Sequence, residues 1–159
     1  MSTVPNKNEV VSPGDCSIMN SFNDASAGPD AEALARFLTK NGFPTFCTRI
    51  YCPTACGKWS DATEKGTASC KIYIPLITKG WQEPHECQYE TELIRQRLAR
   101  KEVTIIPVYY KDFDEAYDKK QEGHNYKFKW NDVQSVYQKE GDEGEWMNTI
   151  LKLVVAESQ

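Results

Sequence analysis

Residues 70–110, CKIYIPLITKGWQEPHECQYETELIRQRLARKEVTIIPVYY, decide the fold class of this chain. The segment opens with an unbroken apolar run over residues 70–78 and closes with another over residues 103–110. Continuous runs of β-formers predict strands of a parallel sheet that is covered on both faces. Residues 86–100 between them place apolar side chains at helical spacing. The segment therefore predicts a strand, a helix and a second, parallel strand.

Strand and helix alternate through the rest of the chain as well. This alternation predicts an α/β fold: a doubly wound, mostly parallel five-stranded sheet with right-handed crossovers and helices on both faces. We predict the remaining strands at residues 16–22, 44–50 and 126–130, and helices from Pro29 to a left-handed cap at Gly42, at 61–69 and at 145–156.

Length and composition indicate one globular domain. The chain has 159 residues, of which 40% are hydrophobic and 26% are charged, and this length suits a single core. Residues 1–13 are polar, contain two prolines and show no apolar period. We therefore expect a flexible tail at residues 1–13 and one domain over residues 14–157.

Charge and hydropathy limit the partners. A net charge of −4 argues against binding to phosphate backbones, which requires clustered Lys and Arg. No stretch approaches the roughly 18 apolar residues of a membrane span, and the N-terminus lacks the features of a secretion signal. We expect a cytoplasmic protein that binds neither nucleic acid nor membrane.

The six cysteines are expected to be free thiols, because a reducing compartment disfavours disulfides. Three disulfides remain the alternative. The pair Cys52 and Cys56 also invites a zinc interpretation, but His85 and His124 are isolated and finger-like spacing is missing. No metal is expected.

Familiar nucleotide sites are absent from the sequence. The loop after the first strand, NSFNDASAG, contains neither GxGxxG nor GxxxxGK[ST], which excludes a dinucleotide fingerprint and a Walker loop. A phospho-accepting receiver domain would need an Asp at the end of the third strand, where Leu76, Ile77 and Thr78 stand. Ligands of doubly wound sheets bind at the carboxyl ends of the strands, so that edge is where we expect the site.

Three segments of the chain match, in order, motifs of one known family. The exit of the first strand, IMNSFND, places Met19, Asn20, Ser21 and Phe22 where the family has two aliphatic residues, serine and an aromatic residue, with Asn20 a polar departure. The loop CPTACGKWSD ends in Gly-Lys-aromatic, and IYIPLITKGWQEPHECQYETEL contains a C-x-x-E helix start. Over residues 16–156 the chain resembles the TIR (Toll/interleukin-1 receptor/resistance) domain family.

The resemblance implies a flavodoxin-like fold and one of two functions. Some TIR domains cleave NAD+ at the nicotinamide-ribose bond, giving nicotinamide and ADP-ribose or a cyclic product, in innate-immune or cell-death signalling. NAD+ is then a substrate, and no cofactor is implied. Other members are non-enzymatic scaffolds that act by homotypic TIR–TIR assembly through the loop from Tyr51 to Trp59. Both could hold, because assembly in this family often builds the site from neighbouring protomers.

Glu90 is the catalytic candidate. The C-x-x-E register of NAD-cleaving relatives falls on Cys87 and Glu90. If Cys87, Thr91, Ile94 and Leu98 form the inward stripe, Glu90 lies about 60° from its centre, on the flank of the helix near its start. A carboxylate there would face the ligand edge and suit the helix dipole. The alternative is that Glu90 merely caps or solvates the helix start.

The resemblance also implies substrate-binding positions. Phe22 and Trp59 match aromatic positions near the dinucleotide in enzymatic relatives, with core or loop packing as the alternative. Two departures concern this pocket: Glu86 stands where relatives of the axon-degeneration type have Trp, and Asn23 and Asp24 stand where many relatives have basic residues. The expected substrate-binding residues are Ser21, Phe22, Asn23, Gly57, Lys58, Trp59 and Trp81.

Overall fold

The computed structural model describes residues 10–51, 59–78, 85–110, 136–138 and 144–159. For Asp15, Trp59, Ser60 and residues 85–89 it describes the backbone alone. Structural statements below concern this part of the chain.

The sheet is parallel in every pairing among the described strands. Its order is β2-β1-β3-β5-β6, with β4 also pairing with β3. This is the flavodoxin-like order, because β4 and β5 together occupy one place in the sheet. The predicted α/β class and doubly wound topology are confirmed. The strands are β1 (Ile18–Ser21), β2 (Thr45–Phe46), β3 (Ile72–Ile77), β4 (Thr104–Ile105), β5 (Val108–Tyr109) and β6 (Val136–Tyr137).

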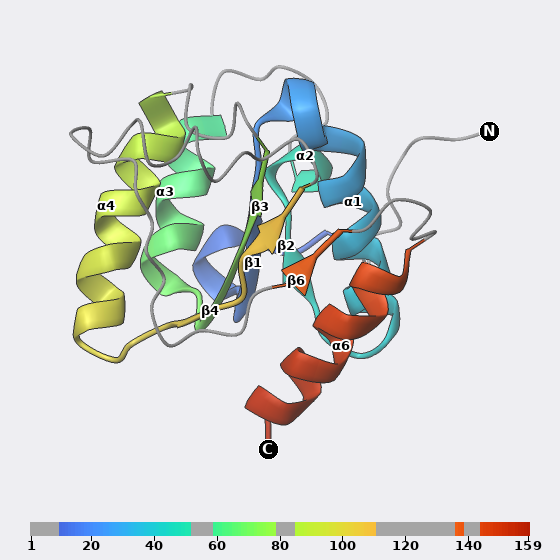
Figure 1. The fold of residues 1–159 in the computed structure, drawn as a ribbon. Coiled ribbons are helices and arrows are strands. Elements are labelled where there is room, and N and C mark those ends of the chain that lie inside the picture. Colours follow the sequence, from blue (N-terminus) through green and yellow to red (C-terminus); the bar gives the residue numbers. More distant parts are fainter. Residues whose placement is uncertain (1–9, 52–58, 79–84, 111–135, 139–143) are drawn as a thin grey trace.

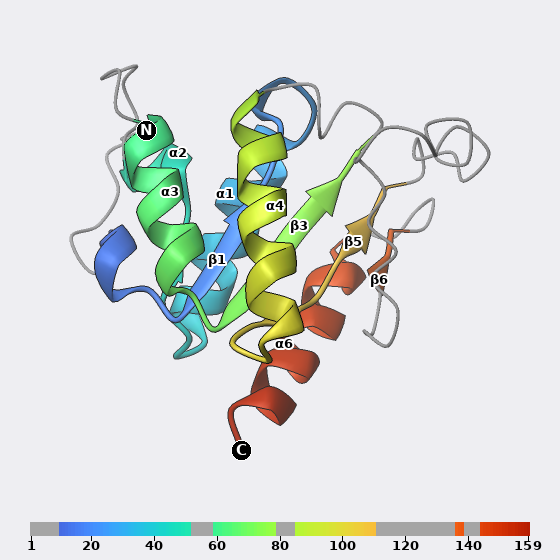
Figure 2. The ribbon, with the colours of Figure 1, turned by 90° about the vertical axis from the view of Figure 1, so that its left-hand side faces the viewer.

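Helices cover both faces of the sheet (Figure 1). α1 and α6 lie on one side and α3 and α4 on the other, and Figure 2 shows α3 and α4 side by side in front of the strands. No described helix is long and apolar enough to cross a membrane. A 3₁₀ turn, η2 (Pro13–Asp15), precedes β1, and the helices are α1 (Asp24–Lys40), α2 (Thr48–Tyr51), α3 (Trp59–Ser69), α4 (His85–Ala99) and α6 (Glu145–Glu157).

The central strand β3 supplies both halves of the core. Successive side chains of a strand point to opposite faces. Ile72, Ile74 and Leu76 therefore join the buried cluster under α1 and α6, while Tyr73 and Ile77 join the cluster under α3 and α4. All six residues of β3 are buried, as the continuous apolar run predicts.

Helix α1 begins at Asp24, so the predicted start at Pro29 is wrong. The Asn23 side chain caps the helix by accepting a hydrogen bond from the Ala25 backbone N–H at 3.0 Å. Pro29 then lies inside the helix. A residue before proline disfavours helical backbone because its Cβ meets the ring, and Gly28 has no Cβ. The predicted cap at Gly42 is confirmed, with a φ of 93°.

The four predicted strands within the described residues are all shorter than expected, and two of them differ most. In the 44–50 segment only Thr45–Phe46 is a strand, and α2 follows because the Cys47 carbonyl accepts hydrogen bonds from Ile50 and Tyr51. The 103–110 segment divides into β4 and β5, because Pro107 between them has no N–H for the ladder. The predicted strand at 126–130 lies outside the described residues. The helices expected at 61–69, 86–100 and 145–156 are confirmed.

Three cysteines have described side chains. Cys16, Cys47 and Cys70 are buried thiols that form no disulfide. Burial raises the pKa of Cys47 and of Cys70 from 9.0 to about 12, so both are neutral at physiological pH. The expectation that the other three are free stays a prediction, because the side chains of Cys52, Cys56 and Cys87 lie outside the described residues.

Candidate functional site

The topology places a switch point at the carboxyl ends of β1 and β3. These strands are neighbours, with Ser21 opposite Pro75. From β1 the chain passes through α1 on one face of the sheet, whereas α3 and α4 flank β3 on the other face (Figure 1). The chain thus diverges to opposite faces at this point, which is where ligands of doubly wound sheets bind.

The exit of β1 brings three predicted site residues to this edge. Ser21 is buried at the end of the strand, and the half-buried Phe22 packs against the core cluster under α1 and α6. The carboxamide oxygen of Asn23 is engaged as the cap of α1. Asn23 thus has a structural role that the sequence reasoning missed, and its predicted contact with substrate stays a prediction.

A hydroxyl pair links α1 to the end of β3. The Ser26 Oγ and Thr78 Oγ1 atoms lie 2.7 Å apart. Thr78 directly follows β3 and is buried, whereas Ser26 lies in the first turns of α1 and is exposed. The sequence reasoning missed this pair, although a threonine that ends an otherwise apolar strand was a visible signal. The pair joins the first turn of α1 to the carboxyl end of β3.

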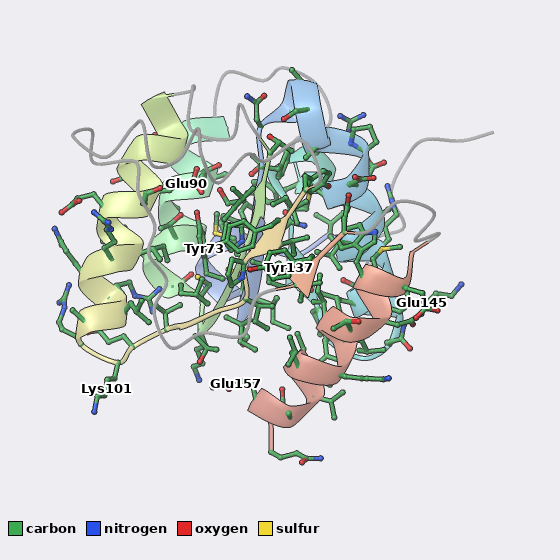
Figure 3. The ribbon with its side chains drawn as sticks, viewed as in Figure 1. Tyr73, Glu90, Lys101, Tyr137, Glu145 and Glu157 are labelled. Atoms are coloured by element: carbon green, nitrogen blue, oxygen red, sulfur yellow. The ribbon has the colours of Figure 1, made fainter. Side chains whose placement is uncertain are left out.

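Glu90 lies in the second turn of α4 and points inward (Figure 3). It is only 4% exposed. The Tyr73 hydroxyl donates a hydrogen bond to Glu90 Oε1 at 3.3 Å, which joins the helix to the central strand. A buried glutamate is rare without polar partners, because removing a carboxylate from water is costly.

The inward face of α4 differs from the predicted stripe. Thr91 and Ile94 are buried as expected, but Glu90 and Arg97 are buried with them and Leu98 is only half-buried. Glu90 is therefore covered more completely than a flank position. Because Glu90 is buried, it is not a solvated residue at the helix start; the alternative that it caps the helix stays open.

Arg97 explains part of this difference between the predicted and the observed inward face of α4. Its guanidinium donates hydrogen bonds to the Thr67 carbonyl at 2.7 Å and the Glu102 carbonyl at 3.3 Å. Arg97 thereby joins α4 to the end of α3 and to the turn after α4, which draws the 90–94–97 side of the helix toward the core.

Tyr73 is a site residue that the sequence reasoning missed. A buried tyrosine needs a partner for its hydroxyl. Tyr73 stands in an apolar strand, and the helix that follows in the sequence carries acidic residues. That combination was a signal in the sequence. Glu92, two residues further along α4, is exposed.

The remaining predicted residues are described in part or not at all. Gly57, Lys58 and Trp81 lie outside the described residues. Trp59 is the first residue of α3, and its side chain is not among those described. No three His, Cys, Asp or Glu side chains gather as a metal site within the described ranges.

Two groups near these strands can carry chemistry: the buried carboxylate of Glu90 beside the Tyr73 hydroxyl, and the separate hydroxyl pair of Ser26 and Thr78. A carboxylate in such surroundings interacts strongly with a positive charge. Hydroxyl groups such as those of Ser26 and Thr78 can donate hydrogen bonds to a polar ligand and accept them from it.

Comparison with known proteins identifies the family. No curated protein matches the chain. The family model described as TIR domain matches residues 18–148. The match runs from the first residue of β1 into the first turn of α6. It covers most of the chain, which therefore belongs to the TIR domain family.

Proposed function

We propose that this TIR domain is a cytoplasmic NAD+ hydrolase, with Glu90 as its catalytic carboxylate, that acts in innate-immune or cell-death signalling. The burial of Glu90 and its hydrogen bond with Tyr73 carry the proposal. An apolar side chain at this position would fill the space beneath α4 without the cost of burying a carboxylate. A residue retained at such a cost is a functional candidate.

The proposed reaction needs a single carboxylate. The bond between ribose C1′ and the nicotinamide nitrogen breaks with both electrons leaving on nitrogen, so the cationic ring departs as neutral nicotinamide. The ribose becomes an oxocarbenium ion, and water attacks C1′ and loses a proton to give ADP-ribose. Ordinary glycosidases also need an acid for the leaving oxygen, but neutral nicotinamide needs no proton.

Glu90 would act by electrostatics. A fixed carboxylate beside C1′ stabilises the developing positive charge, and it can also accept hydrogen bonds from the ribose hydroxyls. Low-dielectric surroundings strengthen this effect. Because Glu90 is 4% exposed, the proposal requires the carboxylate to become uncovered when NAD+ binds.

Incubation with NAD+ tests the activity. Purified protein at several concentrations should release nicotinamide, with ADP-ribose or its cyclic form appearing in equal amount by chromatography. A rate per molecule that rises with protein concentration would indicate that assembly completes the site. No nicotinamide at any concentration would refute the enzyme and leave the scaffold function.

One observation favours the scaffold as a second candidate. Tyr137 on β6 is 62% exposed and stacks on Tyr109 with ring centroids 5.2 Å apart. Among the described strands β6 is at the edge of the sheet, and edges with unpaired backbone groups can accept a partner. If this edge mediates homotypic assembly, Tyr137→Arg should abolish concentration-dependent self-association in sedimentation velocity, whereas unchanged association would place the contact elsewhere.

A further inference from the structure

Tyr73 is held from both sides in the centre of the sheet. It pairs with Met19 of β1 and with Ile105 of β4, and its backbone carbonyl accepts a hydrogen bond from the Ile106 N–H at 2.9 Å. Its side chain is fully buried in the core cluster under α3 and α4. Close packing confines the ring to one rotamer. The hydroxyl lies on the long axis of the ring, so even a ring flip leaves its oxygen in place.

This fixed hydroxyl contacts a buried carboxylate. Glu90 is 4% exposed and is the only buried acidic side chain among those that the structure describes. Its Oε1 atom accepts the hydrogen bond of Tyr73 at 3.3 Å. Figure 3 shows the two residues on the same side of the sheet, Tyr73 on β3 and Glu90 on α4. A glutamate side chain has several torsions, and a fixed donor at its end removes much of that freedom.

The backbone that carries Glu90 is fixed as well. Arg97 lies about two turns further along the same face of α4 and is 8% exposed. Its guanidinium donates to the Thr67 carbonyl at 2.7 Å, and its Nη1 atom lies 3.8 Å from the Cys70 Sγ atom. Arg97 thus fastens the helix to α3 and to the residue before β3, while Tyr73 fastens the carboxylate. Glu90 is therefore anchored at its backbone and at its charged end.

Such anchoring matters for electrostatic catalysis. A carboxylate stabilises a developing positive charge best when it needs no reorientation during the reaction. Side chains around a reacting centre are kept in place by packed neighbours and by hydrogen bonds from behind. Tyr73 adds no charge and lies on the strand side of Glu90, in the core. Its effect should therefore appear in the rate of bond cleavage and not in the binding of NAD+.

We propose that Tyr73 is a positioning residue for the catalytic carboxylate. Its hydroxyl holds Oε1 of Glu90 from the core side, so that the carboxylate, once uncovered, already has the orientation that stabilises the oxocarbenium ion. This inference rests on the proposed NAD+ hydrolase function. Tyr73 acts through Glu90 and takes no part in bond cleavage.

Steady-state kinetics of nicotinamide release test the proposal. Tyr73→Phe keeps the ring and removes the hydroxyl. Its kcat should fall about ten- to a hundredfold, while KM for NAD+ should stay within about twofold of wild type, because an interaction that acts in the transition state is lost. All rates are measured at a temperature at which circular dichroism shows each variant fully folded.

A double variant separates positioning from a merely structural role. In Tyr73→Phe/Glu90→Gln the residual rate should equal that of Glu90→Gln alone, because Tyr73 has no carboxylate left to position. If Tyr73 only supported the fold, its loss would lower the rate by the same factor with and without the carboxylate.

Ile74→Val is the matched control for stability. Ile74 is the next residue of β3, is fully buried and belongs to the core cluster on the opposite face of the sheet. Losing one methyl group there destabilises the same strand without touching Glu90. The variant should keep kcat within about twofold of wild type, even where its melting temperature falls by as much as that of Tyr73→Phe.

The failures are distinguishable. If wild type releases nicotinamide, an unchanged kcat in Tyr73→Phe would overturn the positioning role alone. So would equal losses in Tyr73→Phe and Ile74→Val, or a Tyr73→Phe loss that persists in full beside Glu90→Gln. No release by wild type at any protein concentration would overturn both this inference and the proposed function.

Discussion

Replacing Tyr73 by phenylalanine should destabilise the chain by about 1–2 kcal/mol. The change removes one hydroxyl from a side chain that is fully buried and leaves its ring in place. A hydrogen bond to a charged group is worth about 1.5–3 kcal/mol. The 3.3 Å separation from Glu90 Oε1 exceeds the usual O–H···O range of about 2.5–3.0 Å, which places the effect at or just below the low end of that range.

Thermal and urea unfolding measure this effect. For a domain of this length the melting temperature of Tyr73→Phe should fall by about 3–6 °C. Tyr137→Phe is the control, because the same hydroxyl is lost from a side chain that is 62% exposed, and it should match wild type. A double-mutant cycle with Glu90→Gln should give a coupling of about 1 kcal/mol. Coupling indistinguishable from zero would refute the account of a carboxylate held by Tyr73.

Three further changes test the energetics of the fold. The Asn20 side chain donates a hydrogen bond to the Ala31 carbonyl at 2.8 Å, but its buried Oδ1 atom has no hydrogen-bond partner among the described residues. Asn20→Leu should therefore raise the free energy of unfolding in urea by up to about 1 kcal/mol; a clear fall would show that the amide stabilises the fold. Arg97→Met should lower the free energy of unfolding by about 2–3 kcal/mol, because the Thr67 and Glu102 carbonyls lose their hydrogen-bond donor. A smaller loss in urea unfolding would contradict the role given to Arg97. Above about pH 9 the unfolded chain loses the thiol protons of Cys47 and Cys70. The folded chain keeps these protons until the pH approaches the raised pKa of about 12. Stability should therefore fall as pH rises from about 9 toward 12, and less steeply in a variant with alanine at both positions; identical slopes would refute the raised pKa values.

The order of elements was predictable because apolar periodicity reports burial directly. The continuous run that forms β3 and the spacing that forms α4 follow from covering a sheet on both faces. Element boundaries were less predictable, because they depend on single backbone groups. Pro107 divides a strand through its missing N–H, and the cap at Asn23 starts α1 ahead of Pro29.

The candidate site was predictable only as separate positions. Sequence register pointed to Glu90, but its burial depends on how α4 rotates against the sheet. That rotation is set in part by Arg97, whose donors satisfy carbonyls on α3 and in the turn after α4. Likewise the Ser26–Thr78 hydroxyl pair joins residues that are 52 positions apart, and no local pattern predicts that contact.

The most direct test of the central claim compares Glu90→Gln with Glu92→Gln in nicotinamide release from NAD+. Both changes remove one carboxylate charge from α4, but Glu90 is buried against Tyr73 whereas Glu92 is exposed. Losing one preorganised electrostatic contact costs about a hundred- to a thousandfold in rate. The account predicts a loss of that size for Glu90→Gln, with the fold intact by circular dichroism, and near wild-type activity for Glu92→Gln. Equal activity of the two variants would contradict it.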